Sequence, residues 1–110
     1  MVLDTVNNGG TVRTHYVGPN GDIHELSLPS GSPWEHFDLS VVGGGVGTAA
    51  GPLAIVLDTI NNGGTVRTHY VGNGDIHELS LFGNGWHHYD LSQIGGGVNT
   101  AGGAVTSAAH

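Results

Sequence analysis

The stretch VLDTVNNGGTVRTHYVG at residues 2–18 decides the architecture, because it recurs as VLDTINNGGTVRTHYVG at residues 56–72. A single position differs, with Val6 in the first copy and Ile60 in the second. Self-similarity at a fixed period is the signature of proteins in which each repeat is one supersecondary unit packed against the next. The repeat therefore has to be interpreted before any local motif.

The repetition extends over the rest of the chain. The segment NGDIHELSL at 20–28 recurs unchanged at 73–81, and SVVGGGVGTAAG at 40–51 realigns with SQIGGGVNTAGG at 92–103. The spacing between equivalent residues is 52 to 54 positions. We therefore divide the 110-residue chain into a first repeat, 1–55, and a second repeat, 56–110.

Each repeat contains four short segments rich in β-branched or aromatic residues, which is typical of strands. In the first repeat they are VLDTV, TVRTHYV, DIHELSL and WEHFDLS. Between them stand NNGG, PNGD and PSGSP, and in the second repeat NNGG, NGD and FGNG, all residues that favour tight turns. No stretch shows helical spacing of apolar residues with caps at both ends, so we predict no helix. Four strands joined by three hairpins predict one up-and-down antiparallel sheet, the form of a propeller blade.

We therefore predict an all-β protein, a β-propeller built from two four-stranded antiparallel blades per chain. Two blades are too few to close a ring. The segment AVTS at 104–107 aligns with PLAI at 52–55, which leads into the first strand of the second repeat. We expect this C-terminal tail to close onto a neighbouring chain in a head-to-tail contact. Three chains would supply six blades, so the predicted assembly is a homotrimer.

Composition excludes several classes of protein. The chain has two Arg, no Lys and nine acidic residues, giving a formal charge of −7 that repels a phosphate backbone, so no nucleic acid partner is predicted. It contains no Cys, which excludes disulfides and thiolate sites. No apolar run is long enough to cross a bilayer. We expect a soluble protein without membrane insertion, and the compartment, including secretion or direction to a cell surface, stays open.

One set of residues in each repeat resembles the blade motif of the fucose-specific propeller lectins, the Aleuria-type fungal proteins and their small two-repeat bacterial relatives. That motif has an Arg, a Glu and a Trp in this order. The second repeat carries Arg67, Glu78 and Trp86, and the first carries Arg13, Glu25 and Trp34 with one extra residue in each interval. The resemblance covers essentially the whole chain.

The resemblance implies a carbohydrate-binding protein without a cofactor, whose partners are fucosylated glycans bound between adjacent blades of a trimer. It groups Arg13, Glu25 and Trp34 in one class of site, and the equivalent three residues of the second repeat in another. Arg donates to sugar oxygens, ionised Glu accepts from hydroxyls, and Trp covers the apolar face of a deoxyhexose. Relatives often carry a further Trp three residues after the Glu, where this chain has Leu28 and Leu81.

The residues alone leave other interpretations open. Each Arg and Glu could form a structural pair between blades, and each Trp could serve blade packing. A repeat scaffold with no ligand, natural or engineered, is the alternative to a lectin. The eight His residues include His87 and His88, but adjacent strand residues point to opposite faces, so we predict no metal site.

An enzyme is the remaining class. Glycosidases need two carboxyl groups placed about the scissile bond, and most acidic residues here stand at strand ends or turns. We expect Asp38 and Asp90, which follow the fourth strands, to bond turn amides. The sequence lacks a GxSxG nucleophile motif and a P-loop, and its GGG segments at 43–45 and 95–97 are not followed by Lys. We therefore predict no enzymatic activity.

Overall fold

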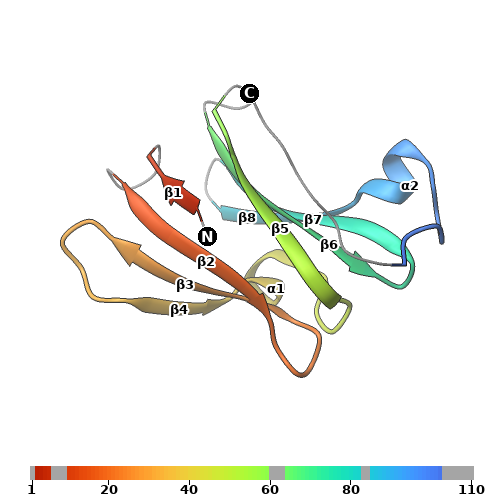
Figure 1. The fold of residues 1–110 in the computed structure, drawn as a ribbon, viewed down its shortest axis with the longest axis horizontal. Coiled ribbons are helices and arrows are strands. Elements are labelled where there is room, and N and C mark those ends of the chain that lie inside the picture. The colour runs from red at the N-terminus through yellow and green to blue at the C-terminus, as the bar shows by residue number, and fades with distance from the viewer. Residues whose placement is uncertain (1, 6–9, 60–63, 83–84, 103–110) are drawn as a thin grey trace.

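The computed structural model describes residues 2–5, 10–59, 64–82 and 85–102, which form two four-stranded antiparallel sheets (Figure 1). The first sheet has the order β1-β2-β3-β4 and the second β5-β6-β7-β8, so each repeat folds as a meander in chain order. The prediction of an all-β chain with four strands per repeat is confirmed. This arrangement is compatible with two propeller blades.

The strand bounds follow the predicted segments closely. The first sheet contains β1 (Val2–Asp4), β2 (Thr11–Val17), β3 (Ile23–Pro29) and β4 (Glu35–Asp38). The second contains β5 (Ala50–Asp58), β6 (Thr65–Gly72), β7 (Asp75–Phe82) and β8 (Gly85–Asp90). The segment 52–55 lies within β5, which has a register shift between Ala50 and Leu53. The predicted role of the tail, 104–107, concerns residues outside those described.

The hairpin between β6 and β7 shows why the turn residues matter. Gly72 pairs with Asp75, and the two residues between them, Asn73 and Gly74, have φ angles of 52° and 79°. Asn and Gly tolerate this left-handed region, and the pair is typical of a two-residue hairpin turn. The first repeat carries an additional Pro19 in this turn. The predicted turns NNGG and FGNG fall largely on residues outside the described ranges.

Two short helices correct the expectation that no helix forms. Helix α1 (Leu39–Gly43) follows β4 and α2 (Leu91–Gly95) follows β8, so each predicted fourth strand ends at its Asp. The side chain of Asp38 accepts a hydrogen bond from the Val41 N–H, and that of Asp90 accepts one from the Gln93 N–H, both at 3.1 Å. These bonds satisfy helix-terminal amides, as N-caps do, and they confirm the predicted bonding of both Asp side chains. A single turn is too short to show helical periodicity in sequence.

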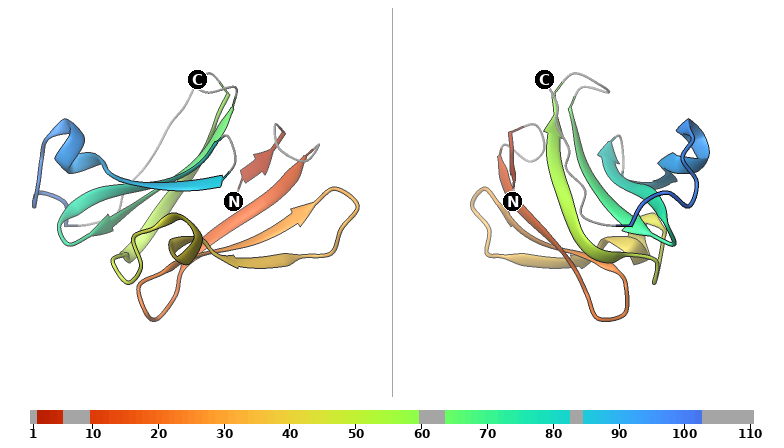
Figure 2. Two further views of the ribbon diagram at one scale, coloured as in Figure 1. Left: turned by 180° about the vertical axis from the view of Figure 1, so that it is seen from behind. Right: turned by 45° about the vertical axis from the view of Figure 1, so that its right-hand side comes forward.

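The two sheets meet through opposite faces. Side chains alternate across a strand, so β2 buries Thr11, Arg13 and His15 against the second sheet, whereas β6 buries Thr68 and Tyr70 toward the first. The buried hydrophobic core lies where these faces meet, and it consists of Ile23, Leu39, Ala49, Tyr70 and Leu79. Helix α1 contacts β7 and β8, and so ties the first repeat to the second sheet (Figure 2). No helix within the described ranges is long and apolar enough to span a membrane.

A candidate ligand site between the two sheets

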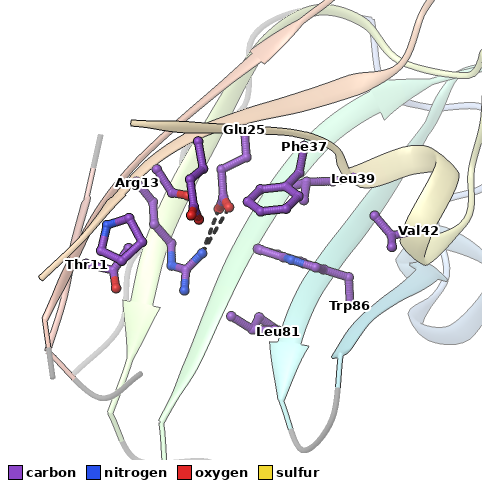
Figure 3. Close-up of a pocket in the computed structure, with 11 residues that line it drawn as sticks. Thr11, Arg13, Glu25, Phe37, Leu39, Val42, Leu81 and Trp86 are labelled. Carbon is purple, nitrogen blue, oxygen red and sulfur yellow. Dashed lines mark hydrogen bonds and ion pairs between the residues drawn. The ribbon is translucent and has the colours of Figure 1, made fainter. Parts of the chain in front are cut away.

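A cavity of about 350 Å³ lies between the two sheets, beside α1 (Figure 3). This volume is at the lower end of the range of about 300–1,000 Å³ that is usual for ligand pockets. Both repeats contribute to it. Its lining residues are Thr11, Arg13, Glu25, Ser27, Pro29, Glu35, Phe37, Leu39 and Val42 from the first repeat, and Leu81 and Trp86 from the second.

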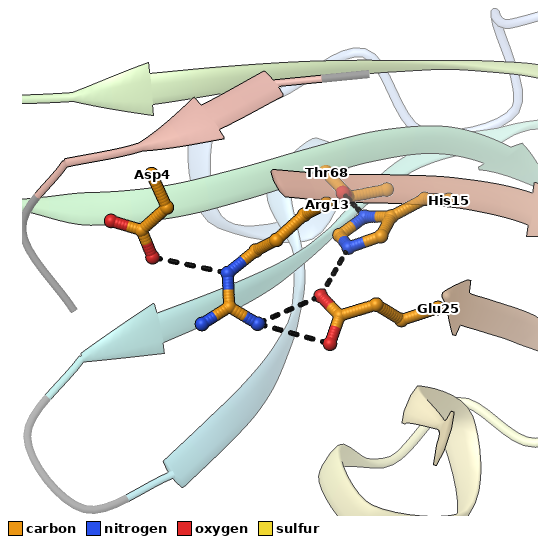
Figure 4. Close-up of polar contacts among 5 residues, drawn as sticks. All are labelled: Asp4, Arg13, His15, Glu25 and Thr68. Atoms are coloured by element: carbon orange, nitrogen blue, oxygen red, sulfur yellow. Dashed lines mark hydrogen bonds and ion pairs between the residues drawn. The ribbon is translucent and has the colours of Figure 1, made fainter. Parts of the chain in front are cut away.

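A charged network forms the polar side of this cavity (Figure 4). The Nε of Arg13 donates to Oδ2 of Asp4 at 3.0 Å, and its Nη1 donates to both carboxylate oxygens of Glu25, each at 3.0 Å. All three side chains are at least nine-tenths buried. Removing one partner of a buried ion pair leaves an uncompensated charge, at a cost of about 3–5 kcal/mol. The network therefore holds β1, β2 and β3 together as well as facing the cavity.

His15 connects this network to the second sheet. Its Nε2 lies 2.8 Å from Oε2 of Glu25, and its Nδ1 bonds the hydroxyl of Thr68 on β6. A neutral ring protonated at Nε2 satisfies both contacts, because Nε2–H donates to the carboxylate and Nδ1 accepts from the hydroxyl. The ring also meets Trp86 edge-on, with ring centroids 5.5 Å apart. His15 is thus a polar link between the two repeats.

The surroundings of His15 and Glu25 favour a neutral imidazole and an ionised carboxylate. Burial lowers the pKa of His15 below its ordinary value, although the neighbouring Glu25 carboxylate acts in the opposite direction. Burial acts to raise the pKa of Glu25, but the hydrogen bond from His15 and the charge of Arg13 outweigh it and hold the pKa below its ordinary value. At neutral pH the network therefore contains an ionised Glu25 and a neutral His15.

Aromatic and aliphatic side chains form the other side of the cavity. Phe37 from β4 and Trp86 from β8 lie across from Arg13 and Glu25 (Figure 3). Leu81 extends the apolar wall. A cavity with hydrogen-bonding groups on one side and aromatic rings on the other suits a small ligand with both polar and apolar faces.

The structure groups the residues of the lectin-like motif differently from the sequence. Arg13 and Glu25 line the cavity together with Trp86 of the second repeat. Trp34 is 52% exposed and is not among the lining residues. Glu35 and Phe37 of β4 line the cavity, whereas Trp34 lies just before the first residue of that strand.

Arg67 and Glu78 form the matching network in the second sheet. The Nε of Arg67 donates to Oδ2 of Asp58 at 3.0 Å, and its Nη1 donates to Oε1 of Glu78 at 2.9 Å. His69 lies 2.8 Å from the other oxygen of Glu78. The Arg67 side chain is 22% exposed, against 7% for Arg13. No second sheet covers this network among the described residues.

Sequence reasoning missed several lining residues. Thr11, Ser27 and Glu35 contribute polar groups, and Phe37 contributes an aromatic ring. The pairing of Arg13 with Ser27, and of Ser27 with Glu35, places them on the Arg13 face. Extending the alternation outward from Arg13 in the predicted strands could have found them, but only with the register known. The alternative interpretation, a structural pair of Arg and Glu between blades, is also altered. Arg13 and Glu25 pair within one sheet, and His15 and Thr68 make a polar contact between the sheets.

The fold and the cavity together define a two-sheet repeat protein with a pocket at the junction of its repeats. Comparisons of the chain with protein-family models, with curated proteins and with solved structures give no significant match. The lectin resemblance therefore depends on the motif residues of the sequence.

Proposed function

We propose that the protein is a carbohydrate-binding lectin that recognises fucose or a similar deoxyhexose in the cavity between its repeats. The observation that supports this most directly is the composition of the cavity, with Arg13 and Glu25 on one side and Phe37 and Trp86 on the other. A deoxyhexose has hydroxyls and a ring oxygen that need donors and acceptors, and a methyl group that packs on an aromatic ring.

The roles of the polar residues follow from their existing bonds. Glu25 already accepts from Arg13 and His15, so its main role is to fix the Arg13 guanidinium in place. The Nη2 group of Arg13 makes none of these bonds and supplies the donor for a sugar oxygen. Ser27 and Glu35 supply further hydrogen-bonding groups at the cavity wall.

We also propose that copies associate head to tail into a trimer of six blades. The face of the first sheet that carries Leu26 and Trp34 is partly exposed, and it is the repeat equivalent of the face that buries Leu79 and contacts His15 through Trp86 in the second sheet. The partly exposed Arg67 face is likewise equivalent to the buried Arg13 face. Each open face thus matches one that is already covered within the chain, which is a heterologous contact that closes into a ring when the rotation permits. Trp34 of a neighbouring copy would then complete the site at Arg67.

Calorimetric titration with L-fucose tests the ligand. We expect saturable binding that is weakened at least about tenfold by Phe37→Ala, because the aromatic wall is lost. Val41→Ala is the control, since Val41 lies on the exposed side of α1 and does not line the cavity. Absence of any response to millimolar fucose, or equal loss in both variants, would contradict the proposal.

Light scattering after gel filtration tests the assembly separately. We expect a particle of about three times the 11.2 kDa chain mass. Trp34→Glu should reduce this mass, because it places a charge on the face that the neighbouring copy covers. A stable monomer would contradict the trimer while leaving the cavity within the chain intact.

A ligand-free repeat scaffold is the second candidate. The observation in its favour is the saturation of Glu25 by Arg13 and His15, which is also expected of a purely structural network. The fucose titration separates the two functions, because a scaffold shows no binding with either the original chain or the Phe37→Ala variant.

A further inference from the structure

Asp75, His77 and Asp90 form a second cluster at the far end of the second sheet. Each offers one ligand atom, and these atoms lie within 4.8 Å of one another. The distance from Nε2 of His77 to Oδ2 of Asp90 is 3.9 Å. Asp75 and His77 are nine-tenths buried, and Asp90 is partly exposed. None of the three residues lines the ligand cavity.

The tight β6–β7 turn adds a third oxygen beside the two carboxylates. Gly72 pairs directly with Asp75, and its carbonyl oxygen lies 2.9 Å from Nε2 of His77. The distances from Nε2 of His77 to the Gly72 oxygen and to Oδ2 of Asp90, 2.9 and 3.9 Å, bracket the edge of about 3.3 Å of a tetrahedron with metal–ligand bonds of about 2.0 Å. The cluster thus has one nitrogen and two carboxylate oxygens within 4.8 Å of one another, and the Gly72 carbonyl oxygen lies beside the nitrogen.

The charges of Asp75 and Asp90 also favour a bound cation. Two carboxylates close together favour either a shared proton or a cation between them. The chain has no Lys, and its two Arg residues are engaged by Asp4 and Glu25 and by Asp58 and Glu78. No permanent cation of the chain is therefore left to neutralise Asp75 and Asp90.

The outer contacts suit a histidine ligand. His88 Nε2 lies 3.0 Å from Nδ1 of His77, so His77 protonated at Nδ1 donates to His88 and presents the lone pair of Nε2 to the cluster. Metal-binding histidines are commonly oriented by such a bond from their other nitrogen. Tyr70 stacks on the same ring at 5.3 Å and fixes its plane. The other neutral form of His77 instead donates from Nε2 to Gly72, and it is the competing state.

The carboxylates of Asp75 and Asp90 are oriented by hydrogen bonds from backbone amides. Oδ1 of Asp75 accepts from the Asn99 N–H at 2.7 Å, and Oδ1 of Asp90 accepts from the Gln93 N–H at 3.1 Å. The other oxygen of Asp90, Oδ2, faces His77. Hydrogen bonds of this kind orient carboxylates that bind metal ions.

We propose that Asp75, His77 and Asp90, with the Gly72 carbonyl, bind one divalent metal ion of the zinc class. Imidazole nitrogen favours zinc and similar transition metals over magnesium and calcium, which prefer oxygen ligands alone. The cluster occurs in the second repeat only. The equivalent residues of the first repeat, Asp22, His24 and Asp38, are all described but do not bring three ligand atoms within 4.8 Å of one another. The two repeats differ here, because the first has a longer turn that contains Pro19.

The test is titration of the full chain with Zn²⁺ at pH 7.5, followed by calorimetry, with Co²⁺ absorption as a second readout of tetrahedral nitrogen and oxygen ligation. We expect one tight site per chain that Asp90→Asn weakens at least about tenfold. Asn still caps α2 through its side-chain oxygen, so this variant should fold, and circular dichroism checks that it does. Asp38→Asn makes the same change in the first repeat and should leave zinc binding unchanged.

Three results would overturn the proposal. The first is no zinc binding by the original chain, which would leave the cluster as a hydrogen-bonded group without a metal. The second is equal zinc binding by the original chain and folded Asp90→Asn, which would place the metal on other histidines. The third is preference for Ca²⁺ or Mg²⁺ over Zn²⁺. Because the cluster lies outside the ligand cavity, each result is independent of fucose binding.

Discussion

Leu26 and Leu79 occupy the same position in two nearly identical repeats, yet Leu26 is 37% exposed and Leu79 is fully buried. Tyr16 and Tyr70 differ in the same way, at 41% and 0%. The two Arg residues show the reverse order, since Arg13 is more buried than Arg67. The same strand pattern thus has a different environment in each repeat, because each sheet is covered on a different face.

Burial in this chain is therefore a property of the junction between the two repeats and not of the repeat itself. The first sheet offers its charged face and the second its Tyr70 face, and the one junction within the chain covers both. Substitutions at equivalent positions should therefore have unequal effects in the isolated chain. The effects should become equal where neighbouring copies cover the remaining faces, so measurements at different protein concentrations test this difference between the repeats.

The largest difference is expected for the two Arg residues. Arg13→Leu leaves the buried carboxylates of Asp4 and Glu25 without a cation and should lower the free energy of unfolding by about 3–5 kcal/mol. Arg67→Leu should cost less, about 1–2 kcal/mol, because its network is partly exposed to solvent. Urea denaturation of dilute protein measures both. The destabilisation by Arg67→Leu should grow with protein concentration if copies associate through the Arg67 face. A destabilisation that does not change with concentration would argue against coverage of this face by a neighbouring copy.

The next difference concerns the polar link between sheets. Thr68→Val removes the hydroxyl that bonds His15 and leaves a buried ring nitrogen without its donor, at a cost of about 1–3 kcal/mol. Thr14→Val is the matched control at the equivalent position of the first repeat, and we expect it to cost less than about 0.5 kcal/mol in dilute protein. Equal costs for the two variants in dilute protein would show that the link contributes little.

The pH dependence should report the same junction. His15 has a lowered pKa in the folded chain, so below its ordinary pKa of about 6.5 the unfolded state binds more protons than the folded state. Stability should therefore fall as the pH drops below about 6.5, by up to about 1.4 kcal/mol per pH unit, and fall further below the ordinary range of Glu25. His15→Gln should flatten the first part of this curve. His36→Gln, on the exposed face, serves as the control, and an unchanged slope in His15→Gln would exclude His15 as the source.

The smallest effect is expected at the helix caps. Asp38→Ala should cost about 1 kcal/mol, because the Val41 amide loses its acceptor, whereas Asp38→Asn should be nearly neutral. Thermal unfolding monitored by circular dichroism measures both. If Asp38→Asn were as costly as Asp38→Ala, the charge of Asp38 and not its capping oxygen would be what stabilises the helix.

Much of the fold could be predicted from sequence because its signals are local. The repeat predicted two equal units, and β-branched runs between Asn-Gly turns predicted the strands, with TVRTHYV matching β2 residue for residue. The caps at Asp38 and Asp90 were also predictable from their place after a strand. The helices they begin were not, since five residues carry no periodic pattern.

Only part of the candidate site could be predicted from the sequence. Arg13 and Glu25 were named because the motif places them in order, but the motif joined them to Trp34, whereas the cavity joins them to Trp86. Order along the chain does not tell which face of a strand meets the next sheet. The cluster of Asp75, His77 and Asp90 was missed for a related reason, because its members come from two strands whose pairing brings His77 opposite Asp90.

The two repeats, their meander of strands and the residue types on each face follow from the sequence alone, because they depend on interactions between near neighbours in the chain. Only the tertiary structure decided that the Arg13 face of one sheet meets the Tyr70 face of the other. That choice depends on the packing of Ile23 and Leu39 against Leu79, contacts between residues far apart in sequence. Two repeats with nearly the same residues consequently have one covered and one open copy of each face.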